Sequence, residues 1–204
     1  MRKKRIKQSE ISIRLLLTFV EMSQKMNKQQ TIFGIALVVL AASMKVITFP
    51  FSINPIIAIS LFSGTLIKDR KLAFLLPLVA MLVSDIMLEF SGIADGFYGW
   101  GQIGNYFSLL AVAALGFGIQ KPNFFNVPAF SIIGSVLFFF LSNTSVFLFD
   151  TQLTYGSGFA GWASCLTAGI PFVKNAAVID LSFSVLIFGT YALMSKTANK
   201  EAKA

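Results

Sequence analysis

The sequence predicts an all-α membrane protein of six transmembrane helices with both ends in the cytoplasm. Of its 204 residues, 55% are apolar and only 13% are charged, whereas soluble domains carry about 25% charged residues. The apolar residues are gathered into long runs with few charges, which is typical of membrane-spanning segments. These observations exclude a soluble enzyme, a disordered chain and a repeat solenoid. The single cysteine, Cys165, excludes a secreted domain held together by disulfides.

Six apolar segments are expected to form the helices. They are Ile32–Phe49, Pro55–Ile67, Leu72–Phe90, Gly101–Ile119, Val127–Phe149 and Pro171–Met194. About 20 residues cross a hydrocarbon core of about 30 Å, and five of the segments reach or nearly reach that length. The 13 residues of Pro55–Ile67 extend only about 20 Å. This segment is therefore either a short crossing or a re-entrant segment.

Prolines and their neighbours predict where these helices begin and end. Pro50 is expected to end the first helix, and Pro77 to kink the third helix from within. Three pairs of residues are expected to begin helices: Asn54 with Pro55, Asn126 with Pro128, and Gly169 with Pro171.

The basic residues fix the predicted orientation. If all six segments cross, 15 of the 17 Lys and Arg fall on one side, while the loops at 91–100 and 150–170 contain none. The positive-inside rule then places both ends of the chain in the cytoplasm. The rule also favours a full crossing by Pro55–Ile67, because otherwise the basic loop at 68–71 and the C-terminal tail would be exported.

The two ends of the chain are expected to lie outside the helical domain, which is assigned to residues 31–195. Residues 1–30 begin with basic residues, and apolar residues then recur every three or four positions, at Ile11, Leu15, Phe19, Met22 and Met26. This pattern favours a basic amphipathic helix on the inner membrane surface. The alternatives are a disordered tail or a chain that starts at Met26. Residues 196–204 are expected to form a basic cytoplasmic tail.

The polar side chains of the predicted helices gather at one level, toward the outside. Ionisable residues within a bilayer cost about 2.5–3.5 kcal/mol each on insertion scales, and they tend to be functional. The outer polar positions are Lys45, Asn54, Asp85, Glu89, Asn105, Asn143, Thr144, Lys174, Asn175 and Asp180. The inner halves of the helices carry little polarity beyond Ser and Thr. This one-sided cluster predicts a cup that is open outward and closed inward, because a channel needs polar groups through its full depth.

Seven of these side chains are the candidate substrate-binding residues: Asp85, Asn143, Asn175 and Asp180 first, then Glu89, Asn105 and Lys45. Asp85 and Glu89 lie four residues apart, so their carboxylates are expected to converge. Such a pair would share a proton, bind a cationic ligand, or pair with Lys45 or Lys174. The alternative is a salt-bridge network that only fixes the helices. Asn143 and Asn105 could likewise serve as interhelical hydrogen-bonding residues.

Aromatic residues are also concentrated on the predicted outer side, at Tyr98, Trp100, Tyr106, Tyr155 and Trp162. They form either an interfacial aromatic belt or a stacking wall for a flat heterocyclic ligand. The segment 159–170 has helical spacing, and glycines lie within it and just before it, at Gly156, Gly158, Gly161 and Gly169. It is expected to lie in the membrane plane over the mouth of the cup, where its glycines would suit a hinged lid.

Motifs for catalysis are missing from the sequence. It contains no G-x-x-x-x-G-K-[ST] phosphate loop, no histidine, and no Cys or carboxylate spacing typical of a metal site. We therefore expect no enzyme activity, no catalytic residues, no metal and no cofactor. The basic residues are explained by membrane orientation, so lipid and a small solute are the expected partners and nucleic acid is not.

Several of these residues lie in short motifs. They are Asn54-Pro55-Ile-Ile-Ala58, Leu61-Phe62-Ser-Gly64, Leu76-Pro77-Leu78 with Ser84-Asp85, Gly104-Asn-Tyr106, Ser142-Asn143, and Ile170-Pro171-Phe172 with Asn175 and Asp180. Between about Ile32 and Leu193 the chain resembles a family of small, uncharacterised bacterial six-helix membrane proteins regarded as transport proteins. That family is similar to the substrate-binding (S) components of energy-coupling factor transporters.

The resemblance implies a vitamin- or micronutrient-capture subunit with an S-component-like bundle in the bacterial cytoplasmic membrane. Such a subunit binds its ligand on the outer side, and a transmembrane coupling subunit with two ATPases drives the transport. S components usually carry an Ala-x-x-x-Ala patch in the first helix, and Ala36, Ala41 and Ala42 do not give that spacing. The alternatives are a stand-alone secondary transporter or channel, and a non-catalytic membrane scaffold protein.

Overall fold

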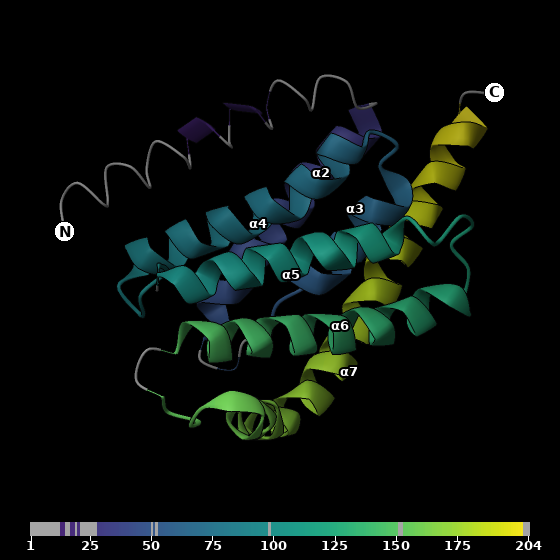
Figure 1. Cartoon of the computed structure of the whole chain (residues 1–204). Coiled ribbons are helices and arrows are strands. Elements are labelled where there is room, and N and C mark those ends of the chain that lie inside the picture. Colours follow the sequence, from purple (N-terminus) through teal and green to yellow (C-terminus); the bar gives the residue numbers. More distant parts are fainter. Residues whose placement is uncertain are drawn as a thin grey trace.

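The structure, a computed structural model, describes residues 13, 14, 17, 18, 20, 28–49, 51, 53–97, 99–150 and 153–201. These residues form six helices and no strand (Figure 1). The helices are α2 (Lys28–Ile47), α3 (Ile56–Leu66), α4 (Arg70–Ser91), α5 (Trp100–Gly116), α6 (Asn126–Phe149) and α7 (Gly158–Glu201). The predicted all-α fold is thus confirmed. Most of the expected N-terminal segment 1–30, together with Pro50 and Tyr98, lies outside the described residues.

Four of the described helices are long and apolar enough to cross a membrane. They are the helices that contain Gln30–Ile47, Arg70–Ser91, Asn126–Phe149 and Gly158–Thr197. With 17 and 11 residues, α5 and α3 are shorter. The chain therefore has the character of a membrane protein. In Figure 1 the α5–α6 loop and the C-terminal end of α7 lie at one end of the bundle, and the α4–α5 and α6–α7 loops lie at the other. The predicted topology requires this alternation, and the side that faces the cytoplasm stays a prediction.

The short helix α3 is the centre of the bundle. Nine of its 11 residues are buried, and it packs against α4, α5, α6 and α7. A helix surrounded by protein does not have to match the bilayer thickness, because its neighbours cover it instead of lipid. The segment that looked too short to cross is therefore the most enclosed helix of the described chain.

Close packing between α3 and α5 depends on small residues. A Cβ atom added to Gly64 would lie 1.9 Å from the Ala113 carbonyl oxygen, and one added to Gly116 would lie 2.6 Å from the Leu61 carbonyl oxygen. Thr65 Oγ1 also donates a hydrogen bond of 3.2 Å to the Gly116 carbonyl across this contact. The two backbones therefore touch, as small residues permit in membrane helices.

The helix ends follow from local hydrogen bonds. Asp69 accepts the N–H groups of Lys71 (2.9 Å) and Leu72 at the start of α4, and Gly92 ends that helix at a φ of 67°, which is the usual C-terminal conformation. At the start of α3 the Asn54 side chain accepts the Ile56 N–H at 3.0 Å. As expected, α6 begins at Asn126, and the Asn126 N–H donates to Asn123 Oδ1 at 2.9 Å.

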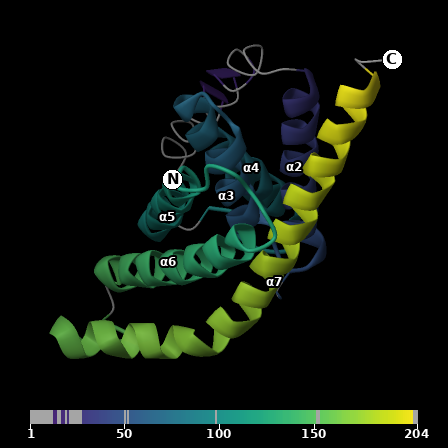
Figure 2. The same ribbon diagram turned by 90° about the vertical axis from the view of Figure 1, so that its right-hand side faces the viewer.

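The last helix differs from the expectation. Gly169 and Pro171 were expected to begin it, but α7 is continuous from Gly158 to Glu201, with Pro171 inside it. Figure 2 shows its first part running beside α6 and the remainder turning sharply away. A proline inside a helix removes one hydrogen bond and bends the helix without ending it when the flanking residues favour helix. The expected in-plane segment 159–170 and the last crossing are therefore one bent helix, which also extends into the expected C-terminal tail.

Aromatic side chains close one end of the bundle. The rings of Phe33 on α2, Phe62 on α3, and Phe188 and Tyr191 on α7 pack in tilted and edge-to-face contacts, with centroids 5.2–5.5 Å apart. Buried aliphatic residues of α2, α3 and α4 surround these rings in the core. This aromatic floor is packed from three helices that are far apart in the sequence.

Candidate solute-binding cavity

A cavity of about 560 Å³ lies between α2, α3, α4, α6 and α7. Its volume is within the range of small-molecule sites, about 300–1,000 Å³. The lining residues are Lys45, Phe49, Asn54, Ile56, Ile57, Met81, Leu88, Asp95, Ser135, Phe138, Phe139, Ser142, Asn143, Gly169, Phe172, Val173, Ala176, Ile179 and Asp180. The lining thus combines an apolar, aromatic surface with a few polar groups, as ligand sites usually do.

The cavity exists because α3 is short. Eleven residues extend about 16 Å, roughly half of the hydrocarbon thickness, and the first residues of this helix, Ile56 and Ile57, line the cavity. Phe49 and Asn54 line it from the α2–α3 connection, and Asp95 from the α4–α5 loop. These connections belong to the end of the bundle that the basic residues predict to face outward.

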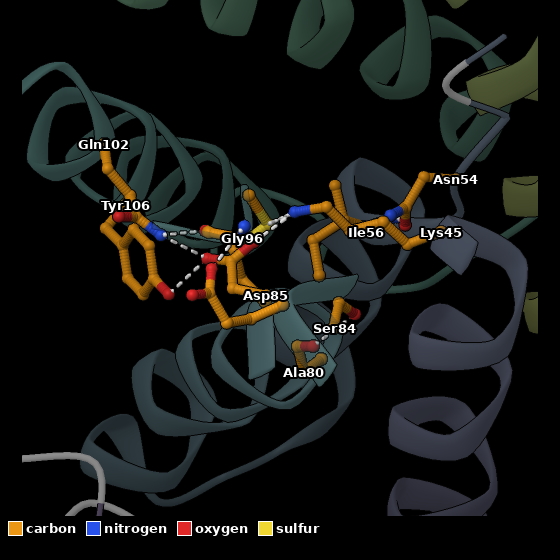
Figure 3. Close-up of polar contacts among 11 residues, drawn as sticks. Lys45, Asn54, Ile56, Ala80, Ser84, Asp85, Gly96, Gln102 and Tyr106 are labelled. Atoms are coloured by element: carbon orange, nitrogen blue, oxygen red, sulfur yellow. Dashed lines mark hydrogen bonds and ion pairs between the residues drawn. The ribbon is translucent and has the colours of Figure 1, made fainter. Parts of the chain in front are cut away.

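Asp85 of α4 is the centre of a buried hydrogen-bond network behind the cavity wall (Figure 3). Its carboxylate is fully buried and forms an ion pair with Lys45 of α2. The other carboxylate oxygen accepts hydrogen bonds of 2.6 Å from Gln102 Nε2 and from the Tyr106 hydroxyl, both on α5. Asp85 does not line the cavity. It therefore joins three helices and fixes the ammonium group of Lys45, which does line the cavity.

Glu89 is separated from Asp85, although the two residues lie one turn apart on α4. The Glu89 side chain is exposed and accepts the Gly96 N–H at 2.9 Å. The α4–α5 loop folds back here, and a Cβ atom on Gly96 would lie 2.0 Å from the Asp85 carbonyl oxygen. The two carboxylates thus have different partners, Lys45 for Asp85 and the loop backbone for Glu89. The two carboxylates therefore share no partner among the described residues, and of the expected alternatives, pairing with Lys45 is found for Asp85.

Asp180 of α7 is the second buried carboxylate, and this one lines the cavity. It is 3% exposed, and its Oδ2 accepts a hydrogen bond of 2.7 Å from Ser135 of α6. Ser135 also contacts the Ser131 carbonyl at 3.0 Å, and Ser184 donates to the Ser131 hydroxyl at 3.0 Å. These serines connect α6 to α7 on the side of Asp180 away from the opening.

Asn143 lines the cavity where α6 and the first part of α7 cross. Its side-chain nitrogen Nδ2 donates a hydrogen bond to the Phe139 main-chain carbonyl at 2.8 Å. The main-chain carbonyl of Asn143 accepts a hydrogen bond from the Cys165 thiol at 3.4 Å. A Cβ atom on Gly169 would lie 2.6 Å from the Phe139 ring and 2.8 Å from Asn143 Oδ1. Gly169 therefore allows α7 to lie directly on these two lining side chains, as a cover for this side of the cavity.

The seven candidate residues divide into three groups. Lys45, Asn143 and Asp180 line the cavity, and Asp85 supports Lys45 from behind. Glu89, Asn105 and Asn175 do not line it; Asn175 and Glu89 are exposed, and Asn105 is half-buried.

Other polar residues of the cavity were missed or not selected: Asn54, Asp95, Ser135 and Ser142 line it, and Gln102 supports Asp85. The aromatic wall also consists of different residues. It is formed by Phe49, Phe138, Phe139 and Phe172, and none of Trp100, Tyr106, Tyr155 and Trp162 lines the cavity. Serine and phenylalanine are common in membrane helices, so only the recurrence of Ser135, Phe138, Phe139 and Ser142 on one face of α6 could have indicated them.

Residues 25–202 match the family of unknown function DUF6580. The chain belongs to that family. No curated protein and no solved structure matches the chain. Membership of DUF6580 assigns no activity, so the function of this DUF6580 protein has to be inferred from its cavity.

Proposed function

We propose that this DUF6580 protein captures a small organic solute in the cavity from the outer side of the bacterial cytoplasmic membrane. In this proposal it is the S component of an ATP-driven importer of micronutrients, with a transmembrane coupling subunit and ATPase subunits as partners. The observation that carries the proposal is a cavity of about 560 Å³ with polar groups from several helices at one end of a membrane bundle.

The distribution of polarity supports capture more than conduction. Lys45, Asn54, Asn143 and Asp180 come from separate parts of the chain and meet at this cavity. At the opposite end, the aromatic floor fills the space between α2, α3 and α7. A protein of this shape binds a solute but needs another component to carry it across. The sequence has no phosphate loop of its own, so ATP hydrolysis would come from a partner.

A stand-alone secondary transporter is the second candidate. The observation in its favour is the row of buried serines, Ser135, Ser131 and Ser184, which continues from Asp180 away from the opening. Polar rows of this kind can serve ion or proton movement in transporters. The row meets the apolar residues Ile187 and Phe188 one turn further along α7, so the capture subunit remains the preferred function.

Filling the cavity tests the proposal directly. Ala176 lines the cavity, and Ala176→Phe is expected to remove a solute that the wild-type protein retains during gentle purification, because the ring occupies its space. Native mass spectrometry of the protein in lipid nanodiscs measures the retained mass and any ATPase subunits that co-purify. Val178→Phe is the matched control, because Val178 is 64% exposed on the same helix and does not line the cavity.

Three results would argue against the proposal. Retention of the same solute by Ala176→Phe and wild type would place the binding site elsewhere. Uptake by vesicles that contain only this chain, with no ATPase, would favour the secondary transporter. A wild-type protein that carries no small molecule and takes none up, with or without ATPase subunits, would favour a scaffold role.

A further inference from the structure

We propose that the solute is an organic cation with an apolar or aromatic body, and that Asp180 is its counter-ion. This inference rests on the proposed function, because it names the chemical class of the captured solute. It depends on three observations: the charge balance of the lining, the surroundings of the Asp180 carboxylate, and the phenylalanine and aliphatic side chains that line the rest of the cavity.

The charges that face the cavity do not cancel. Lys45, Asp95 and Asp180 are its charged lining residues. The ammonium group of Lys45 is already paired with the buried carboxylate of Asp85, so this lysine adds no free positive charge. Two carboxylates then remain, one at depth and one in the outer loop. The cavity is therefore net negative, which favours a positively charged occupant.

The carboxylate of Asp180 lacks a cationic partner within the part of the chain that the structure describes. No Lys or Arg nitrogen of those residues lies within 4.0 Å of it, and the only hydrogen bond to it is the one that Ser135 donates to Oδ2. Its Oδ1 is left without a donor among the same residues. A carboxylate that is 97% buried in a membrane bundle is costly when unpaired. A ligand cation that binds Oδ1 would supply the missing charge.

The remaining wall suits the apolar part of such a cation. Phe138 and Phe139 on α6 and Phe172 on α7 line the cavity together with Ile57 and Met81. Aromatic faces attract cationic groups within about 6 Å and stack against flat rings. Asp95 is exposed in the outer loop, where its negative charge would draw cations toward the opening. The wall and the two carboxylates thus favour the same class of solute.

The inference can be tested with three probes that share one ring and differ in charge. They are benzyltrimethylammonium (positive), benzyl alcohol (neutral) and benzoate (negative). Each is titrated into the purified protein in nanodiscs, and its binding is measured as the rise in the thermal unfolding temperature of the protein. The cation is expected to bind at least tenfold more tightly than the other two. Asp180→Asn should lose at least tenfold of that affinity, while Asp180→Glu should retain most of it because the charge remains.

A matched control removes the same charge far from the cavity. Asp69→Asn at the start of α4 keeps the N-terminal cap, because asparagine caps as well as aspartate, and it is expected to bind the cation as the wild type does. Circular dichroism confirms that each variant is folded. The Asp180→Asn variant is expected to fold, because the asparagine side-chain oxygen can still accept the hydrogen bond from Ser135.

The outcomes separate the two proposals. Binding of benzyl alcohol or benzoate in preference to the cation, unchanged by Asp180→Asn, would overturn the cation class and leave solute capture intact. The same holds if native mass spectrometry finds a retained solute that is neutral or negative. If the wild type retains no solute and binds none of the three probes, both the cation class and the proposed function fail.

Discussion

Asp85→Asn is expected to destabilise the protein by about 3 kcal/mol, at the low end of the cost of breaking a buried ion pair. The substitution leaves the Lys45 ammonium group without its counter-ion at a site that is only 18% exposed. It also weakens the bonds from Gln102 and Tyr106, which the carboxylate accepts at 2.6 Å each. Unfolding of the purified protein in a titration of SDS in mixed micelles measures the free energy.

A double substitution separates charge from packing in this network. Lys45→Met together with Asp85→Asn removes both charges, and is expected to recover most of the lost stability because no unpaired ion remains. With the single variant Lys45→Met measured as well, the difference between the double-variant change and the sum of the two single-variant changes gives the coupling energy of the pair. Wild-type stability for the Asp85→Asn variant would show that the pair does not hold α2 and α4 together.

Gly64→Ala is expected to lower the free energy of unfolding by 3 kcal/mol or more, at or above the upper end of about 1–3 kcal/mol for overpacking. The added Cβ atom would lie 1.9 Å from the Ala113 carbonyl oxygen and 3.1 Å from Gly116 Cα. These are backbone atoms of α5, so the contact is relieved only by moving α5 away from the central helix α3. The same SDS titration measures the loss, and a fall in the folded yield is expected with it.

Gly189→Ala is the matched control for this change. Gly189 is exposed on α7, and a Cβ atom there would meet nothing within 4 Å. Since alanine favours helix over glycine by about 1 kcal/mol, this variant is expected to be as stable as the wild type or slightly more so. Equal effects of the two substitutions would contradict the assignment of Gly64 to a backbone contact.

The positions of the helices could be predicted from the sequence, because long apolar runs reflect the one constraint that a bilayer imposes on every spanning segment. The continuity of α7 could not. Gly169 and Pro171 are residues that typically flank a helix start, but α7 is helical on both sides of the proline, and its first part packs on Asn143 and Phe139 of α6. The burial of α3 on all sides also depends on its neighbours and not on its own length.

Only some of the candidate residues line the cavity, because the sequence does not show which face of each helix points into it. Asn175 and Asp180 are five residues apart, which is about 140° around a helix, so both could not face one cavity. Asp180 is buried there and Asn175 is exposed. Nothing in the sequence indicated a role for Gln102, because a single amide side chain in an apolar helix forms no recognisable pattern. Its role depends on Asp85, 17 positions earlier, and only the fold brings the two together.

The bent helix α7 contributes side chains to the cover of the cavity, to its interior and to the aromatic floor. It contributes Gly169 and Phe172 to the cover of the cavity, Asp180 to its interior and Tyr191 to the aromatic floor. One uninterrupted backbone connects these positions, and no loop separates them. A tilt of α7 would therefore change the cover, the position of Asp180 and the aromatic floor together, so that, under the proposed function, solute release would be coupled to a movement at the opposite end of the bundle.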